Sequence, residues 1–378
     1  MFCQLWVLAL AGLAVAVASN FRLSLDEKFT LDGNYIETTL RIPDASLRPE
    51  DPFRNIALLY RFLGLSEAAD LAAMLSLAVF GVAVFAALRW DELARLTPVG
   101  LCVITACYLL AMIYLAQYSK EFASLLLIAA LLWVPAGLWW EAALVVGMVG
   151  YAITIRPYWG IVAVLYVAGR LLLPRLRGLL PVLVLAALTY VGLQFATNQF
   201  LGQSLSHSRV AVNAIRAEIN VSVGSLIVDF LPAVDSLQWL NALIVLFSLL
   251  APWPLLLDGS LAFLAMAVLL TFLWGLVFVS LVRVQRERSS SLAGATLDSR
   301  HAPLAERAPR VERAIALLLA LVVVQAIFEP DYGSYVKHLA PVLPLFIALL
   351  PLSPGRIGDN RELSVAAEAA TPSKVVQP

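Results

Sequence analysis

Residues 98–134 read PVGLCVITACYLLAMIYLAQYSKEFASLLLIAALLWV, two apolar runs separated only by the polar break Tyr118-Ser119-Lys120-Glu121. An α-helix needs about 20 apolar residues to cross the hydrocarbon core of a bilayer. The first run, 98–117, has that length, and the second continues to residue 140. This stretch therefore predicts two consecutive membrane helices joined by a short turn.

Similar apolar segments recur along the whole chain. They fall near 5–19, 69–89, 98–117, 122–140, 142–155, 157–169, 178–196, 237–257, 260–282, 314–328 and 339–352. The expected fold is all-α, a polytopic transmembrane helical bundle of about 10–11 membrane segments with two longer extracytoplasmic loops. The first segment ends in Ala16-Val17-Ala18 but lacks a basic stretch before it, which favours a retained helix over a cleaved signal peptide.

The composition agrees with a membrane protein. Of 378 residues, 61% are hydrophobic and 14% charged, and the mean hydropathy is +0.86. Soluble domains carry about 25% charged residues, so a soluble enzyme is excluded. The 26 basic and 26 acidic residues cancel, which excludes the basic face of a nucleic-acid binder. Neither the cysteines nor the histidines form a metal or disulfide pattern (Cys3, Cys102, Cys107; His207, His301, His338).

Basic residues predict the orientation, because cytoplasmic loops are enriched in Arg and Lys. Seven arginines mark 283–313 as a flexible cytoplasmic loop, and 356–378 is expected to be a disordered cytoplasmic tail. The membrane domain would then be 1–355, with outer loops at 20–68, 197–236 and 328–338. If successive membrane segments cross the bilayer in opposite directions, 237–257 must be re-entrant or interfacial. The sequence Ala251-Pro252-Trp253-Pro254 would break a helix there.

The first outer loop contains the adjacent acids Asp26 and Glu27. Paired carboxylates after a first membrane helix suit metal binding or deprotonation of an attacking hydroxyl. The pair is similar to one in multi-pass glycosyltransferases that use lipid-linked sugars. The alternative is a solvated loop of mixed charge.

In the second outer loop, Arg209, Asn213 and Arg216 would share one face of a helix. Two guanidinium groups on one stripe suit a pyrophosphate, which they bind through charge-assisted hydrogen bonds. Glu218 or His207 would be a nearby base. The alternative is a helix on the membrane surface whose arginines meet lipid headgroups.

Arg156 lies between two short apolar segments, in Ile155-Arg156-Pro157-Tyr158-Trp159-Gly160. Charges at membrane depth are costly and usually face a partner or a cavity. The alternative is an interfacial arginine in an aromatic belt. Lys120 is a candidate phosphate contact, although Lys120 and Glu121 could instead satisfy each other.

The last outer loop, 328–338, holds two carboxylates, two tyrosines, a lysine and a histidine in eleven residues. Glu329 or Asp331 could act as a base, and Lys337 and His338 could hold phosphate or a sugar hydroxyl, with Tyr335 as a further substrate contact. The alternative is an interfacial belt with a snorkelling lysine.

Several short motifs resemble one family in order and spacing. They are Tyr118-Ser119-Lys120-Glu121-Phe122, Arg156-Pro157-Tyr158-Trp159, the loop of Asn213 and Arg216, Pro252-Trp253-Pro254 with Asp258-Gly259, and 328–338. Over about 25–345, the chain resembles the Wzy-like polymerases of bacterial capsule, exopolysaccharide and O-antigen clusters. The 283–313 loop is not explained by this resemblance.

The resemblance implies a polymerase in the bacterial cytoplasmic membrane that joins undecaprenyl-pyrophosphate-linked repeat units outside the cytoplasm. It implies no cofactor and no metal, and it implies the flippase and chain-length regulator of the same pathway as partners. Arg156, Arg209 and Arg216 would neutralise the leaving pyrophosphate, and Glu218, Glu329, Asp331 or His338 would accept the proton. Two alternatives stay open: a glycosyltransferase using a polyprenyl-phosphate monosaccharide, with Asp26, Glu27 and a divalent cation, and a carrier of lipid-linked glycans.

Overall fold

The computed structural model describes residues 1–42, 48, 51–176, 178–202, 205–218, 225–231, 237–257, 259–292 and 302–353. All regular elements in these ranges are helical, apart from two isolated β-bridges. The all-α prediction is therefore confirmed. The predicted tail, 356–378, lies outside the described residues.

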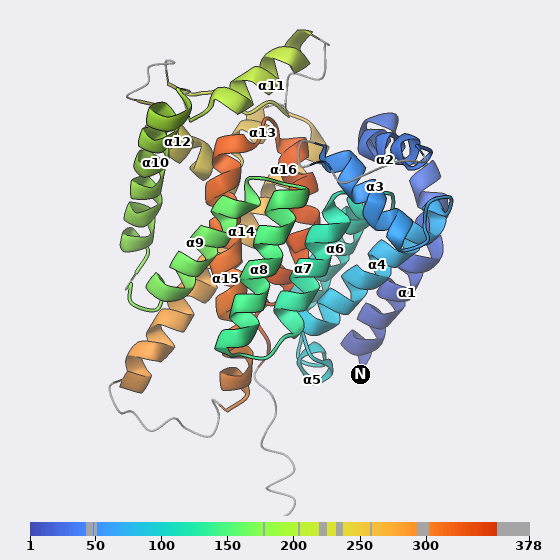
Figure 1. Ribbon diagram of the computed structural model, residues 1–378. Coiled ribbons are helices and arrows are strands. Elements are labelled where there is room, and N and C mark those ends of the chain that lie inside the picture. The colour runs from blue at the N-terminus through green and yellow to red at the C-terminus, as the bar shows by residue number, and fades with distance from the viewer. Residues whose placement is uncertain are drawn as a thin grey trace, which may run out of the picture.

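Within these described ranges, six helices are long and apolar enough to cross a membrane. They are α1 (Phe2–Leu23), α4 (Ala69–Ala87), α6 (Pro98–Leu115), α10 (Leu180–Leu201), α14 (Leu261–Leu292) and α15 (Ala302–Phe328). Four shorter apolar helices accompany them: α7 (Glu121–Trp133), α8 (Leu138–Thr154), α9 (Trp159–Leu172) and α12 (Gln238–Leu250). The chain thus has the helices of a multi-pass membrane protein (Figure 1).

The remaining helices are short or amphipathic. They are α2 (Glu27–Leu40), α3 (Pro52–Phe62), α5 (Trp90–Leu93), α11 (His207–Glu218), α13 (Trp253–Leu257), α16 (Tyr332–Leu339), the 3₁₀ turn η4 (Ala340–Val342) and α17 (Leu343–Ile347). In Figure 1, α2, α3, α11 and α13 gather at the upper end of the bundle, and α5 and the N-terminus lie at the lower end. The helices that lie within the predicted outer loops 20–68 and 197–236 thus share one end.

Local sequence signals set several helix starts. Thr97 accepts a hydrogen bond from the backbone N–H of Gly100 at 3.1 Å, and Pro98 occupies the first turn of α6. Asp51 accepts one from the N–H of Arg54 at 3.0 Å, before Pro52 in α3. These residues satisfy N–H groups that have no partner within the helix.

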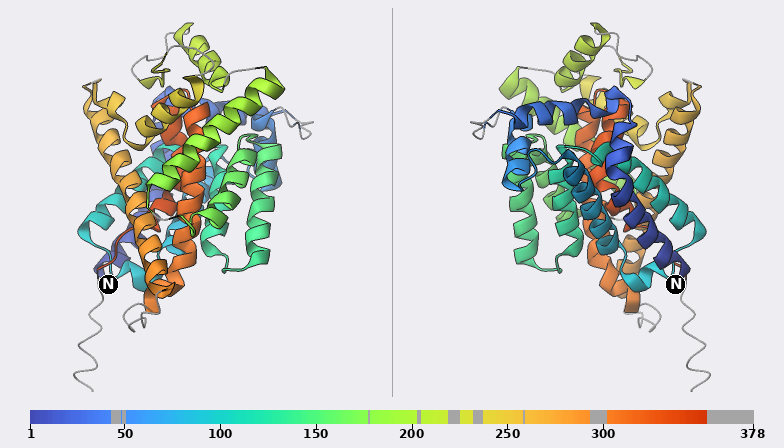
Figure 2. Two further views of the ribbon diagram at one scale, coloured as in Figure 1. Left: turned by 90° about the vertical axis from the view of Figure 1, so that its left-hand side faces the viewer. Right: turned by 90° about the vertical axis from the view of Figure 1, so that its right-hand side faces the viewer.

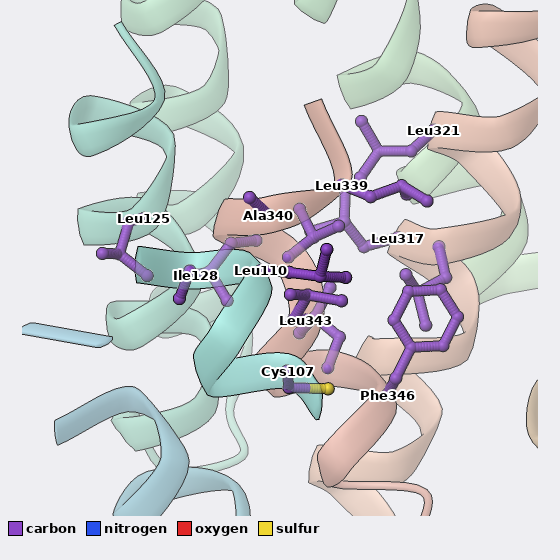
Figure 3. Close-up of a cluster of buried hydrophobic side chains, with 14 of the residues drawn as sticks. Cys107, Leu110, Leu125, Ile128, Leu317, Leu321, Leu339, Ala340, Leu343 and Phe346 are labelled. Atoms are coloured by element: carbon purple, nitrogen blue, oxygen red, sulfur yellow. The ribbon is translucent and has the colours of Figure 1, made fainter. Parts of the chain in front are cut away.

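The core lies where the final segment, η4 and α17, packs against α6, α7 and α15. Figure 3 shows side chains from these elements meeting in one cluster: Cys107, Leu110, Leu125, Ile128, Leu317, Leu321, Leu339, Ala340, Leu343 and Phe346. The expected membrane helix over 339–352 is not a single helix, because Pro341 and Pro344 divide it between η4 and α17. Residues 339–350 are all buried, and irregular backbone at membrane depth requires such cover by protein.

The segment 237–257 is broken where the sequence predicts. The helix α12 ends at Leu250, Ala251 is extended, and α13 begins at Trp253. At 1.5 Å per residue, the 13 residues of α12 span about 20 Å, which is less than the roughly 30 Å of a hydrocarbon core.

The prediction of a flexible loop over 283–313 is wrong at both ends of this range. The helix α14 continues to Leu292 and α15 begins at Ala302, as the two side views of Figure 2 show. Residues 293–301 lie outside the described residues. Arg307, Arg310 and Arg313, which were expected in a flexible loop, are buried in α15 and 0–7% exposed.

Each of these three arginines binds the carbonyl end of a different helix. Arg307 donates to the carbonyl oxygens of Ala348 and Leu350 at 2.7 and 2.8 Å, after α17. Arg310 donates to those of Ala86 and Ala87, at the end of α4, and Arg313 donates to those of Leu131, Val134 and Pro135, at the end of α7. Because helix C-termini carry unpaired carbonyls and partial negative charge, the arginines stabilise these ends.

Replacing Arg310 with leucine is expected to destabilise the bundle strongly. Arg310 is hydrogen-bonded to both carboxylate oxygens of Glu92 at 3.1 Å, and Glu92 is 6% exposed. Removing one partner of a buried ion pair costs about 3–5 kcal/mol. Thermal unfolding of the detergent-solubilised chain measures the effect, with exposed Arg175→Ala as the control. Equal unfolding temperatures for the two variants would contradict this role.

Candidate functional site

The segment between α6 and α7 directs Glu121 into the protein. The hydroxyl of Ser119 donates to Glu121 Oε2 at 2.6 Å and accepts from the N–H of Glu121 at 3.1 Å. The hydroxyl of Tyr60 accepts from the N–H of Ser119 at 3.0 Å and donates to its carbonyl at 3.2 Å. Glu121 is only 1% exposed, so a partner for its charge is required.

That partner is Arg156, in the turn between α8 and α9. Its Nη2 donates to Glu121 Oε1, and its Nη1 lies 2.8 Å from His338 Nε2 and 3.3 Å from the hydroxyl of Tyr158. The side chains of Arg156 and Glu121 are 12% and 2% exposed. Arg156 therefore faces a partner inside the protein, as expected for a charge near membrane depth.

His338 joins this pair to the carboxylate of Glu329. The Nδ1 atom of His338 is hydrogen-bonded to Glu329 Oε1. Because Arg156 has no acceptor atom, His338 Nε2 accepts from its Nη1, and Nδ1 carries the proton that is donated to Glu329. The other oxygen of Glu329, Oε2, is buried and has no hydrogen-bond partner in the part of the chain that the structure describes.

Asp32 of α2 binds two lysines at the edge of the same site. Lys337 donates to Asp32 Oδ2, and Lys120 Nζ lies 3.3 Å from the same atom. Lys120 Nζ also lies 3.6 Å from the centre of the Phe53 ring, a favourable cation–π position. One alternative was that Lys120 and Glu121 pair with each other. Instead, Lys120 binds Asp32, and Glu121 binds Arg156.

We name Asp32, Lys120, Glu121, Arg156, Glu329, Lys337 and His338 the upper charge cluster. Its three cations face three carboxylates, but the charges are distributed unevenly. Two lysines share Asp32, whereas two acids flank Arg156 and His338. The cluster thus has a cationic side at α2 and a side rich in proton acceptors at α15 and α16.

Burial lowers the pKa of Lys120 from 10.5 to about 8, and the charge of Arg156 adds to this effect against the opposing charges of Asp32 and Glu121. Burial alone would raise the pKa of Asp32, but Lys337 and Lys120 outweigh it and hold that pKa below its ordinary value. The ammonium group of Lys120 thus loses its proton near pH 8.

The stability of the wild type relative to Lys120→Met is expected to rise with pH. Between pH 8 and 10.5 the unfolded chain binds more protons than the folded one, so the free energy of unfolding increases across this window. Below pH 8 the full cost of burying the ammonium group is present. The expected gain is up to roughly 3 kcal/mol, measured by chemical unfolding between pH 7 and 10.5.

Lys120→Arg is the matched control for that experiment, because guanidinium stays charged throughout the window. Its stability relative to Lys120→Met should not rise above pH 8. If the free energy of unfolding has the same pH dependence in the wild type and in both variants, Lys120 does not titrate between pH 8 and 10.5.

An apolar groove of about 550 Å³ opens beside the upper charge cluster. Its walls come from α3, α7 and the end of α8: Asn55, Leu58, Leu59, Ala123, Leu126, Leu127, Tyr151, Thr154 and Ile155. Ile155 directly precedes Arg156, and the backbone N–H of Arg156 donates to the carbonyl of Tyr151 at 3.1 Å. The groove therefore lies beside the turn that carries Arg156.

The helix α11 confirms the predicted face of Arg209 and Asn213. Arg209 is 1% exposed and donates to Asp229 and, at 2.8 Å, to the carbonyl of Ala326 in α15. Asn213 donates to the carbonyl of Ile227 at 2.9 Å. The interpretation of Arg209 as a lipid-headgroup contact is wrong, because its guanidinium group is buried in protein. The hydrogen bonds of Arg209 stabilise the position of α11 over the end of α15.

The other candidate residues have different surroundings. Asp331 accepts from the N–H and the hydroxyl of Ser334, both at 2.8 Å, and so caps α16. Tyr335 is in the core, where its hydroxyl accepts from Trp274 Nε1 at 2.7 Å. Asp26 precedes the first turn of α2, and His207 is exposed. The side chains of Glu27, Arg216 and Glu218 lie outside the described residues. No group of three or more metal-ligating side chains occurs within the described ranges.

Two members of the cluster, Asp32 and Glu121, were not among the predicted site residues. A signal for Glu121 exists in the sequence, since a carboxylate at the start of an apolar helix requires a partner. Asp32 gives no such signal, because it is one of several acids between residues 26 and 51.

Comparisons with known proteins do not assign this fold and site to a class. No family model matches the chain, and the comparisons with curated proteins and with solved structures found no match either. The function is therefore argued from the geometry of the site.

Proposed function

We propose that the chain is a membrane glycosyltransferase that polymerises polyprenyl-pyrophosphate-linked oligosaccharide units of a bacterial cell-envelope polysaccharide. The observation that carries the proposal is the upper charge cluster, where a buried arginine and two lysines lie beside a His–Glu pair and an apolar groove. Such a reaction needs cations for the leaving group, a proton acceptor and a place for the lipid.

The roles follow from the two sides of the cluster. Lys120, Lys337 and Arg156 would contact the pyrophosphate, and its polyprenyl chain would lie in the groove at Ile155. His338 would accept the hydroxyl proton of the attacking sugar at Nε2 while Glu329 stabilises the imidazolium ion through Nδ1. This requires Arg156 to leave Nε2, which frees a guanidinium N–H for the phosphate.

The proposed step forms one glycosidic bond, breaks one glycosyl phosphate bond and transfers one proton. The acceptor hydroxyl oxygen forms a bond to the anomeric carbon, and the bond between that carbon and the pyrophosphate oxygen breaks. The polyprenyl pyrophosphate leaves with the electron pair, and the proton goes to His338. In this scheme, the seven side chains of the upper charge cluster supply the charges and the base. The reaction would take place at the upper end of the bundle, outside the cytoplasm.

The test is the length of the glycan in a strain that lacks this chain. We expect single lipid-linked repeat units in place of a ladder on a gel, and restoration of the ladder by the wild-type chain. An altered or missing repeat unit would favour transfer of a single sugar from a polyprenyl phosphate. Accumulation of units on the cytoplasmic face would favour a carrier, and an unchanged ladder would exclude the proposal.

A further inference from the structure

The helix α10 leaves most of its apolar surface uncovered. Only 11% of its most apolar stretch is buried, the lowest share among the six helices of membrane length in the described ranges. It lies at the outer edge of the bundle, where it packs against α12 (Figure 1). Between α10 and α9 an apolar groove of about 110 Å³ remains, with α12, α14 and α15 behind it. In a bilayer, lipid hydrocarbon is the solvent that covers such a surface.

The groove continues into a small polar recess at the lower end of α9. Gly169, Leu173 and Ala316 line both spaces, so the two are continuous. Beyond these residues the walls of the recess carry charge, from Arg170 of α9, Arg288 of α14 and Glu312 of α15. Its volume of about 30 Å³ is enough for one small polar group and too small for a sugar.

The recess belongs to a network with an excess of positive charge. Glu312 Oε2 accepts from Arg170 Nη1 at 3.0 Å, and Glu312 Oε1 accepts from Arg288 Nε at 3.1 Å and from Arg288 Nη2. Arg170 also donates to Glu141 at 3.1 Å. The same oxygen of Glu141 accepts from the buried Arg313 at 2.8 Å. Three arginines thus share two carboxylates, which leaves one positive charge in excess.

The two arginines of the recess are accessible to a ligand. The side chain of Arg288 is 40% exposed and that of Arg170 is 23% exposed. Arg288 Nη1 makes no hydrogen bond to any residue that the structure describes. The turn before α10 is held against α14, because the N–H of Gly178 donates to Gln285 Oε1 at 2.9 Å. Since Gln285 also lines the recess, this bond fixes the recess next to the end of the groove.

We propose that the groove and the recess together bind one anionic phospholipid of the bilayer, with an acyl chain in the groove and a phosphate oxygen between Arg170 and Arg288. Guanidinium groups bind phosphate through charge-assisted hydrogen bonds. A lipid such as phosphatidylglycerol carries one negative charge, which matches the excess charge of the network. Basic pockets between membrane helices on the cytoplasmic side bind anionic headgroups, and the arginines at this end predict that it is cytoplasmic. Arg156 precedes the other end of α9, so this site is independent of the reaction proposed there.

The experiment is native mass spectrometry of the purified full chain in detergent, titrated with palmitoyl-oleoyl phosphatidylglycerol. We expect one tightly bound lipid per chain, and weaker binding of phosphatidylcholine, which has the same phosphate but no net charge. Arg288→Gln should lower the affinity for phosphatidylglycerol about fivefold, because it removes one cation from the headgroup. Arg283→Gln is the matched control, since Arg283 is an exposed arginine of the same helix that lines neither the groove nor the recess.

A second pair of variants tests the groove. Ala186→Phe fills it from α10, and we expect the affinity for phosphatidylglycerol to fall about fivefold or more. Val184→Phe adds the same ring to α10 at a position that is 49% exposed and outside the groove, so it should bind normally. This pair keeps the proposal testable if Arg288→Gln does not fold.

Three results would overturn the proposal. The first is equal affinity for phosphatidylglycerol and phosphatidylcholine, which would mean that the charge of the recess does not select the lipid. The second is the same affinity in a correctly folded Ala186→Phe as in Val184→Phe. The third is displacement of the lipid by millimolar inorganic phosphate, because the recess would then bind a free anion and the groove would contribute nothing.

Discussion

Replacing Arg156 with alanine is expected to abolish the polymer ladder and leave single repeat units. Arg156 contacts the buried acid Glu121 and the His338 ring, and it directly follows Ile155, which lines the apolar groove. In the proposed mechanism it moves from His338 Nε2 to the leaving pyrophosphate, so its loss removes charge stabilisation in the transition state. Removal of such a donor typically costs about 10²–10³ in rate. Glycan length in the complemented deletion strain measures the effect.

A purely structural role for Arg156 predicts a different outcome. Arg156→Ala strands the carboxylate of Glu121, which is 1% exposed, and the loss of a buried partner costs about 3–5 kcal/mol of stability. The double variant Arg156→Ala/Glu121→Gln removes the stranded charge as well. We expect it to recover thermal stability without recovering the ladder. Recovery of both would mean that Arg156 only neutralises Glu121, and a full ladder from a well-inserted Arg156→Ala would exclude the proposed role.

Much of the fold could be predicted because apolar length and helix breaks are local properties of a membrane sequence. The apolar runs, the break at Ala251-Pro252 and the helix at 207–218 each follow from neighbouring residues. The extent of the helices at 283–313 did not follow, because Arg307, Arg310 and Arg313 are stabilised by carbonyls of three other helices. Without those partners in view, a run of arginines is typical of a solvated loop.

The site was predicted only in part for the same reason. Arg156, Lys120, Glu329, Lys337 and His338 stood out as charges between apolar segments, and the structure brings them together. Their partners are remote in the chain: Asp32 is 305 residues from Lys337, and Glu121 is 35 residues from Arg156. Sequence spacing predicts contacts within a helix, but it does not show which charges face each other across the bundle.

Replacing the proposed base His338 and its partner Glu329 is expected to give losses in rate that do not multiply in the double variant. His338→Gln should lower the rate of polymerisation about 10²–10⁴-fold, the usual contribution of a general base. Glu329→Gln retains an acceptor for the Nδ1 proton but loses the negative charge, so the rate constant should fall while the apparent affinity for the lipid-linked unit changes little. Initial rates with membranes of the deletion strain and added lipid-linked units separate the two quantities.

The double variant decides whether the two residues act as a unit. Glu329 is a positioning residue in this scheme, because it reaches the substrate only through the ring of His338. Once His338 is gone, the charge of Glu329 has no imidazolium ion to stabilise, so Glu329→Gln/His338→Gln should be no slower than His338→Gln alone. If the two losses multiply instead, Glu329 acts on the substrate by itself through Oε2, which has no hydrogen-bond partner among the described residues. The proton would then go directly to Glu329, and His338 would serve only to hold Arg156.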